Sequence, residues 1–181
     1  PVHLDLPEDV ALAEARETIP EIPSGVRLGT PDMAVLDAAY RRLTRAERPI
    51  AVIGADARRM RDPTLLRRIV ERHNMPFAVT TMAKGLIDED HPLSLGCIER
   101  ACRQLQRQFL RQADLILALG YDTVEVEYEA WIGDVPLLHV GLEPADTDGK
   151  VALAEQVTGD LDSAIGDLAS RPPLELAWQR E

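Results

Sequence analysis

The chain has 181 residues, of which 45% are hydrophobic and 28% charged, a composition typical of a globular protein with its own core. It contains 20 lysine and arginine residues against 31 aspartate and glutamate residues, for a formal net charge of −11. This charge argues against nucleic acid or an anionic membrane surface as a partner. No apolar run is long enough to span a membrane.

The two ends of the chain are predicted to be linkers. Apolar and polar residues alternate over residues 2–6, which predicts a short half-buried strand that ends at Pro7. Residues 8–30 show little sustained periodicity and contain several prolines, so we interpret them as an interdomain linker. Residues 171–181 come after a helical pattern that ends at the proline pair 172–173, which indicates a second linker. Because the chain opens without Met in a strand pattern, we expect it to be a piece of a longer protein.

Between these ends, buried strand patterns alternate with helical patterns. Short aliphatic runs predict strands over residues 50–53, 76–80, 113–120, 135–141 and 151–157. Apolar residues at helical spacing separate them, including a face formed by Ile98, Cys102, Leu105 and Phe109. The alternation predicts an α/β fold over residues 31–170. It is a doubly wound, Rossmann-like parallel sheet of about five to six strands with helices on both faces.

The candidate site lies in the loops that follow these strands, because ligands of such sheets bind outside the carboxyl ends of the strands. The loops supply backbone N–H groups, hydroxyls and carboxylates, which suit a nucleotide better than a catalytic reaction. The dinucleotide fingerprint G-x-G-x-x-G is absent, since no glycine follows Gly54 at the required spacing. The candidate binding residues are Gly54, Ala55, Asp56, Thr80, Thr81, Met82, Gly120, Tyr121, Asp122 and Glu143.

No catalytic or metal-binding set is predicted elsewhere. Cys97 and Cys102 lack the C-x-x-C spacing, so we interpret them as reduced thiols of a cytoplasmic protein. The acidic run at residues 88–92 includes a histidine, but consecutive residues rarely converge on one ion, which favours a polar turn. His139 lies inside an apolar strand pattern and His73 near a helix end, positions typical of structural histidines.

Several segments, in this order and spacing, resemble the central domain of thiamine-diphosphate-dependent enzymes of the acetolactate synthase type. They are residues 48–54 (RPIAVIG), 80–85 (TTMAKG), 91–96 (HPLSLG) and 113–120 (ADLILALG). Residues 1–7 resemble the closing strand of that family's N-terminal, pyrimidine-binding domain. Gly120-Tyr121-Asp122, with Glu125 and Trp131, resembles the catabolic synthases more than the anabolic, FAD-containing ones. The resemblance implies a fold of the DHS-like NAD/FAD-binding type.

The resemblance also implies an activity that this stretch cannot perform alone. Such enzymes decarboxylate a 2-oxo acid on thiamine diphosphate with Mg²⁺ and transfer the activated aldehyde to an acceptor. Their cofactor-activating glutamate lies on the N-terminal domain and their G-D-G motif on the C-terminal domain, and neither stretch is present here. We therefore expect a non-catalytic central domain whose partners are those two domains, in a parent homodimer or homotetramer.

FAD is the nucleotide cofactor that the resemblance raises for the crevice. Flavin-containing members carry glycine-rich character after the first strand and an arginine-containing run after the third. Here Asp56 and Asp122 stand in those places, and carboxylates disfavour a pyrophosphate. We therefore favour an architectural role over FAD binding.

Other interpretations stay open at this point. The domain could belong to another thiamine-diphosphate-dependent 2-oxo acid decarboxylase or carboligase. A stand-alone NAD-using deacylase shares a similar sheet, but its expected zinc cysteines and catalytic histidine layout are missing. A free nucleotide-sensing module is the remaining alternative, and the flanking reading frame would distinguish it from the enzyme domains.

Overall fold

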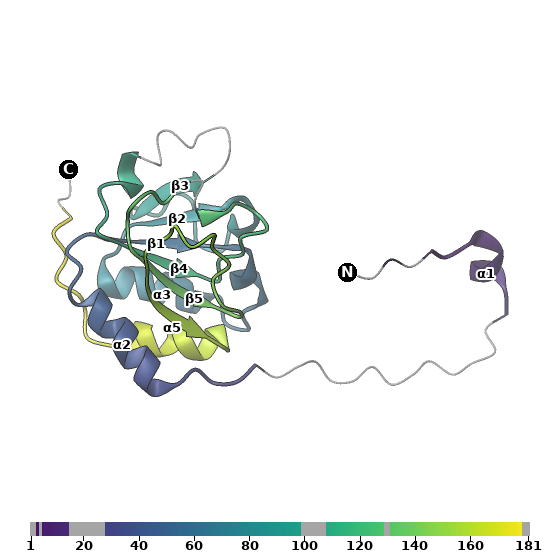
Figure 1. The fold of residues 1–181 in the computed structure, drawn as a ribbon, viewed down its shortest axis with the longest axis horizontal. Helices are drawn as coiled ribbons and strands as arrows, with labels where there is room; N and C mark the ends of the chain where they lie inside the picture. The colour runs from purple at the N-terminus through teal and green to yellow at the C-terminus, as the bar shows by residue number, and fades with distance from the viewer. Residues whose placement is uncertain (1–2, 4, 15–27, 99–107, 129–130, 179–181) are drawn as a thin grey trace.

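A computed structural model of the chain describes residues 3, 5–14, 28–98, 108–128 and 131–178 (Figure 1). Its elements are α1 (Glu8–Leu12), α2 (Met33–Leu43), β1 (Pro49–Ile53), the 3₁₀ helix η1 (Ala55–Arg59), α3 (Thr64–His73), β2 (Phe77–Thr80), the 3₁₀ helix η2 (Thr81–Ala83), β3 (Ser94–Ile98), β4 (Leu115–Leu119), β5 (Leu137–Gly141), β6 (Leu153–Thr158) and α5 (Leu161–Ser170).

The six strands form one sheet in the order β3-β2-β1-β4-β5-β6, and every neighbouring pair is parallel. Ala51 of β1 lies opposite Phe77 of β2 on one side and opposite Leu117 of β4 on the other. The chain winds outward from β1 in one direction and from β4 in the other, so the switch point lies between these two strands. The predicted doubly wound parallel sheet is confirmed.

Two apolar cores sandwich the sheet. Every residue of β1, β2, β4 and β5 is buried, which explains why these strands are continuous aliphatic runs. The helices α2, α3 and α5 lie together along one face (Figure 1) and share a core with alternate strand residues. The opposite face packs against the helical residues 108–110, through Leu110, and against the segment that contains Tyr128 and Trp131.

The helix α3 lies between β1 and β2, where apolar residues at helical spacing separate two of the predicted strands. α3 buries Leu65, Leu66, Ile69, Val70 and His73 on one face. Asp160 caps the start of α5, and its carboxylate accepts hydrogen bonds from the backbone N–H and the hydroxyl of Ser163 at 2.9 and 2.6 Å. That cap satisfies one of the N–H groups that a helix start leaves without a partner.

The structure corrects the predicted third helix at its start. Ile98 belongs to the strand β3, while Phe109 does lie in helical backbone. Cys102 and Leu105 fall outside the described residues. β3 is an edge strand, mostly half-buried, with an irregular register against β2 and a glycine, Gly96, at a φ of 85°. It therefore lacks the continuous apolar run by which the buried strands β1, β2, β4 and β5 were recognised.

The ends of the chain also differ from the sequence-based expectation. His3, Asp5 and Leu6 are exposed and lie in no strand, so these described residues do not form the short half-buried strand predicted over residues 2–6. The predicted linker 8–30 contains the short helix α1, whose first turn carries Glu8 and Asp9, where negative charge is favourable. The assignment of both ends as linkers stays a prediction.

The tail after α5 is held against the body of the domain. The Tyr40 hydroxyl donates to the carbonyl of Pro172 at 2.9 Å. The backbone N–H of Ala177 donates to the carbonyl of Glu47 at 2.7 Å, and the Trp178 indole N–H donates to the carbonyl of Pro49 at 2.9 Å. The tail therefore crosses back from α5 to the start of β1.

Candidate functional site

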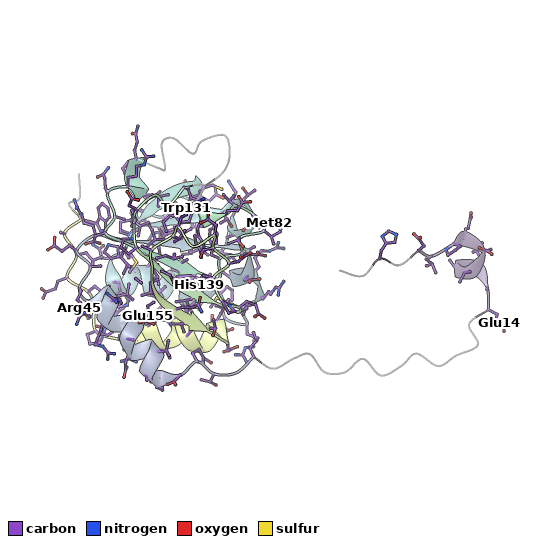
Figure 2. All side chains as sticks on the ribbon, viewed as in Figure 1. Glu14, Arg45, Met82, Trp131, His139 and Glu155 are labelled. Carbon is purple, nitrogen blue, oxygen red and sulfur yellow. The ribbon has the colours of Figure 1, made fainter. Side chains whose placement is uncertain are left out.

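The predicted site residues follow the carboxyl ends of four adjacent strands, β2, β1, β4 and β5. Because the strands are parallel, their four loops meet at one edge of the sheet, as predicted. Figure 2 shows Met82 at this edge, toward which the strand arrows point, and Arg45 at the opposite edge. This edge is the place where a doubly wound sheet would receive a ligand.

The loops after β1 and β4 are in direct backbone contact. A Cβ atom added to Gly54 would lie 2.4 Å from the Cα atom of Tyr121 and 2.7 Å from the carbonyl oxygen of Gly120. Gly120 has a φ of 60°, and its own Cβ would lie 2.5 Å from the backbone nitrogen of Ala57. The switch point is thus filled by protein backbone, which only glycine at both positions allows.

The backbone N–H groups of the loop after β1 are all used within the protein. Gly54 donates to the carbonyl of Leu119 at 3.0 Å, and Asp56 to the carbonyl of Gly120 at 2.9 Å. Ala57 donates to the carbonyl of Gly54 at 3.1 Å. The N–H group of Ala55 donates to Oε2 of Glu125 at 3.1 Å. A bound diphosphate needs such groups as donors, and here each already has an acceptor.

Glu125, which the sequence analysis did not include among the site residues, lies at the centre of this edge. Its Oε2 atom also accepts the hydroxyl of Thr80 at 2.6 Å, and its Oε1 atom accepts the N–H group of Met82 at 2.9 Å. Both carboxylate oxygens are therefore bound by donors from the loops after β1 and β2. The Glu125 carboxylate therefore occupies the position at which these donors would bind an anionic ligand.

Several carboxylates at this edge lie near Asp56, Glu125 among them. Burial raises the pKa of Asp56, Arg59 opposes this, and Asp122, Glu125 and Glu143 add smaller repulsions that raise the pKa further. Arg59 Nε lies 3.3 Å from Oδ1 of Asp56 but is largely exposed. Among the described residues, no cluster of histidine, cysteine and acidic side chains could hold a metal ion. The edge is electronegative, which opposes the binding of another anion.

Two predicted site residues, Tyr121 and Glu143, belong to a hydrogen-bonded network. It lies in the apolar core on the face of the sheet opposite α2, α3 and α5, called here the second core. The Tyr121 hydroxyl donates to the carbonyl of Val126 at 2.7 Å and accepts the Trp131 indole N–H at 2.8 Å. Tyr121 stacks on Tyr128 with ring centroids 4.4 Å apart. His139 is bonded to the Glu143 carbonyl through Nε2 at 3.0 Å and to the Tyr128 hydroxyl through Nδ1 at 2.8 Å. A carbonyl only accepts, so Nε2 carries the proton and Tyr128 donates to Nδ1.

His139 is thus a satisfied core histidine, as predicted, and burial lowers its pKa, so the ring is neutral. Figure 2 places Trp131 and His139 among the interior side chains. The remaining predicted site residues lie at the rim. Asp122 Oδ1 accepts the N–H group of Val124 at 2.9 Å, and the hydroxyl of Thr81 lies 3.9 Å from the Cys97 sulfur.

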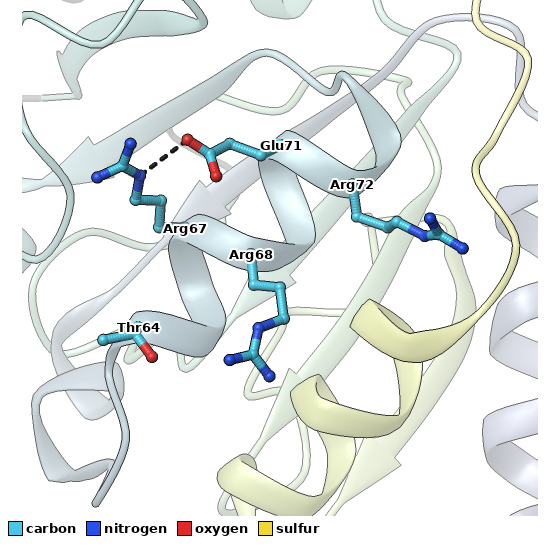
Figure 3. Close-up of a pocket in the computed structure, with 5 residues that line it drawn as sticks. All are labelled: Thr64, Arg67, Arg68, Glu71 and Arg72. Atoms are coloured by element: carbon cyan, nitrogen blue, oxygen red, sulfur yellow. Dashed lines mark hydrogen bonds and ion pairs between the residues drawn. The ribbon is translucent and has the colours of Figure 1, made fainter.

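Two hollows lie away from this edge. One, of about 460 Å³, is an open surface on α3 lined by Thr64, Arg67, Arg68, Glu71 and Arg72. In Figure 3 its arginine side chains extend in different directions, and Arg67 is paired with Glu71 at 2.8 Å. The other, of about 1020 Å³, lies near the amino ends of β1 and β2, beside Trp178. Neither hollow is lined by a predicted site residue. The three arginines of α3 are exposed, which is typical of a solvated helix face.

Comparison with known proteins assigns this domain to a family. The family model described as the thiamine pyrophosphate enzyme central domain matches residues 36–168. The chain belongs to this family. The family interpretation is thereby confirmed, and the match spans the whole sheet, the helix α3 and most of α5.

Relatives of this domain occur in several enzymes. A probable acetolactate synthase large subunit of Methanococcus aeolicus is 28% identical over 88% of this chain and 28% of its own length. An oxalyl-CoA decarboxylase of Escherichia coli is 29% identical over 91% of the chain and 29% of its own length. The chain spans less than a third of the length of these relatives.

Solved structures share the fold. A putative thiamin diphosphate-dependent enzyme of Mycobacterium smegmatis superimposes with a TM-score of 0.63 at 23% identity, covering 88% of this chain and 33% of that one. The benzoylformate decarboxylase of Polynucleobacter necessarius gives a TM-score of 0.61 at 22% identity, covering 91% and 31%. No helix among the described residues is long and apolar enough to cross a membrane.

Proposed function

We propose that this central domain is an architectural part of a thiamine-diphosphate-dependent enzyme of the acetolactate synthase type, and that it binds no nucleotide. The parent enzyme would decarboxylate a 2-oxo acid and pass the activated aldehyde to an acceptor. Thiamine diphosphate and Mg²⁺ would bind to the parent's other two domains, which pack against this one. We propose a cytoplasmic homodimer or homotetramer for the parent.

The observation that carries the architectural role is the occupied crevice. The N–H groups of residues 54–57 all donate within the protein, and one of their acceptors is the carboxylate of Glu125. The crevice therefore does not fit FAD: the donors that would hold a pyrophosphate are taken, and Asp56 and Asp122 add negative charge beside them. The loops position neighbouring elements instead of a cofactor.

A thermal-shift titration with FAD, ADP and NAD tests this role. A ligand at about 100 times its dissociation constant stabilises the folded state by roughly 2.7 kcal/mol, which corresponds to roughly 5–10 °C for a domain of this size. We expect less than about 2 °C with each of the three ligands. Asp122→Arg should not restore binding by itself, since the N–H donors remain taken. A large saturable shift with FAD in the unmodified chain contradicts the architectural role.

A second experiment tests the assignment of cofactor binding to the other domains. We expect calorimetric titration of this chain with thiamine diphosphate and Mg²⁺ to show no stoichiometric binding, and the chain alone to consume no pyruvate. The same titration on the full parent protein is the positive control. Stoichiometric binding to this chain would show that it holds the cofactor by itself.

The identity of the oxalyl-CoA decarboxylase relative, 29%, equals or exceeds that of the synthases and supports a second candidate. Here the same domain would serve a thiamine-diphosphate-dependent decarboxylase that transfers no aldehyde to an acceptor. Supplying the parent protein with pyruvate or with oxalyl-CoA distinguishes the two. Formation of acetolactate supports the first, and carbon dioxide release from oxalyl-CoA alone supports the second.

A further inference from the structure

Three hydrogen-bond donors converge on one point at the carboxyl edge of the sheet. They are the N–H group of Ala55 at the start of η1, the hydroxyl of Thr80 at the end of β2 and the N–H group of Met82 in η2. Thr80 is 1% exposed, so its hydroxyl must find its acceptor inside the protein. Three donors from separate elements with no acceptor among them form a cradle for an oxyanion.

The acceptor comes from a distant part of the chain. Glu125 is 70 residues from Ala55 and 45 from Thr80, and it uses both carboxylate oxygens, at 2.6 to 3.1 Å. Hydrogen bonds between a carboxylate and such donors are stronger than those between neutral groups. Because the carboxylates of Asp56 and Glu125 repel each other, the three donors are what favour the Glu125 carboxylate at this position.

The backbone on both sides of Glu125 is fixed. The N–H group of Glu125 donates to the carbonyl of Asp122 at 3.2 Å, which closes a turn. The carbonyl of Val126 accepts the hydroxyl of the buried Tyr121 at 2.7 Å. The neighbouring Val124 is 90% exposed, and its backbone N–H group donates to Oδ1 of Asp122 at 2.9 Å. The turn therefore presents the carboxylate to the cradle in a fixed position, which lowers the entropy lost on forming the contact.

We propose that Ala55, Thr80 and Met82 form a carboxylate-binding site that the chain fills with its own side chain, Glu125, and that this internal ligand fastens residues 121–128 to the ends of β1 and β2. The site accepts a small planar carboxylate in general, and Glu125 is its tethered occupant. This inference depends on the geometry of this edge and is independent of the reaction of the parent enzyme.

Chemical rescue tests the proposal. Glu125→Ala removes a methylene and the carboxylate, and acetate restores both as a free ligand. Acetamide has nearly the same shape but no charge, so it controls for cavity filling. Sodium chloride at equal concentration controls for ionic strength. Glu127→Ala is the matched control variant, since Glu127 is an exposed carboxylate on the same loop.

We expect Glu125→Ala to melt at a lower temperature than the unmodified chain and Glu127→Ala to melt as the unmodified chain does. Acetate should raise the melting temperature of Glu125→Ala in a saturable way, by about 3–6 °C at ten times its dissociation constant. Acetamide and chloride should not. The unmodified chain and Glu127→Ala should show no such rise with acetate, because their cradle is full.

The proposal is overturned if acetate stabilises Glu125→Ala no more than chloride or acetamide does, or if it stabilises Glu127→Ala equally. Glu125→Gln fills the same space with a neutral group and should lose stability without responding to acetate; a response equal to that of Glu125→Ala also contradicts the proposal. If Glu125→Ala does not fold in chloride, circular dichroism in acetate and in acetamide replaces the melting curves. Folding in acetate alone then supports the proposal. A variant that stays unfolded in chloride, acetate and acetamide overturns it. None of these results depends on nucleotide binding, so they are separate from the test of the architectural role.

Discussion

A Cβ atom on Gly54 would lie 2.4 Å from the Cα atom of Tyr121, so the loops after β1 and β4 can meet only where residue 54 has no side chain. The obstacle is backbone, which cannot move aside as the end of a flexible side chain does. We expect Gly54→Ala to destabilise the domain by about 1–3 kcal/mol, the usual cost of overpacking. Urea denaturation measures the loss, and an unchanged midpoint would show that the two loops separate freely.

Gly166 is the control for that substitution, with the opposite expected sign. It lies inside α5, and its added Cβ would meet Leu65 Cδ1 at 3.7 Å, an ordinary van der Waals contact. Glycine within a helix costs stability because its unfolded backbone is unusually free. Gly166→Ala should therefore raise the free energy of unfolding by about 0.5–1 kcal/mol. A decrease in the same urea experiment would contradict this.

The sequence predicted the buried strands of the sheet but not its edge strand β3. The buried strands were recognisable because a parallel strand covered on both faces is a continuous aliphatic run, as in β1 and β4. Because such strands run parallel, the loops that follow them could also be placed at one edge of the sheet. β3 was missed because an edge strand with Gly96 at positive φ carries no such run.

No sequence pattern could have predicted that Glu125 occupies this site. Glu125 resembles any solvated carboxylate of a polar loop, and its role depends on Thr80 and Ala55, which are 45 and 70 residues away. Only the strand order places the three together. Tyr121 likewise follows a strand at a loop position, yet its ring packs in the second core, because the turn that follows it returns to the sheet.

The contact between Tyr128 and His139 gives a further prediction. The Tyr128 hydroxyl is the donor to the buried Nδ1 atom of His139, at 2.8 Å. Tyr128→Phe leaves that nitrogen without its donor, which should cost about 1–3 kcal/mol. Tyr40→Phe is the control, since the Tyr40 hydroxyl bonds to the Pro172 carbonyl in an exposed place and should cost less. Equal losses in thermal unfolding would contradict the role of burial.

The buried histidines predict how stability depends on pH. Burial lowers the pKa of both His73 and His139 below the ordinary value of 6.5. Between the folded and unfolded pKa values the unfolded chain binds more protons, so acid favours unfolding. The free energy of unfolding should therefore be highest above about pH 6.5 and fall as the pH drops below it, by at most about 1.4 kcal/mol per pH unit for each histidine.

His73→Leu separates one of these contributions. His73 Nε2 is bonded to the carbonyl of Leu168 at 3.0 Å, while its buried Nδ1 atom has no hydrogen-bond partner among the described residues. Leucine removes the unpaired nitrogen, and the Leu168 carbonyl keeps the N–H group of Arg171 as a donor at 3.3 Å. The variant should gain stability relative to the unmodified chain as the pH falls from about 7.5 to about 5.5. In the unmodified chain, acid protonates His73 more readily in the unfolded state than in the folded state, and leucine removes this preference. Urea denaturation at both pH values measures the gain. A His73→Leu difference that is the same at both pH values would contradict the lowered pKa of His73 in the folded chain.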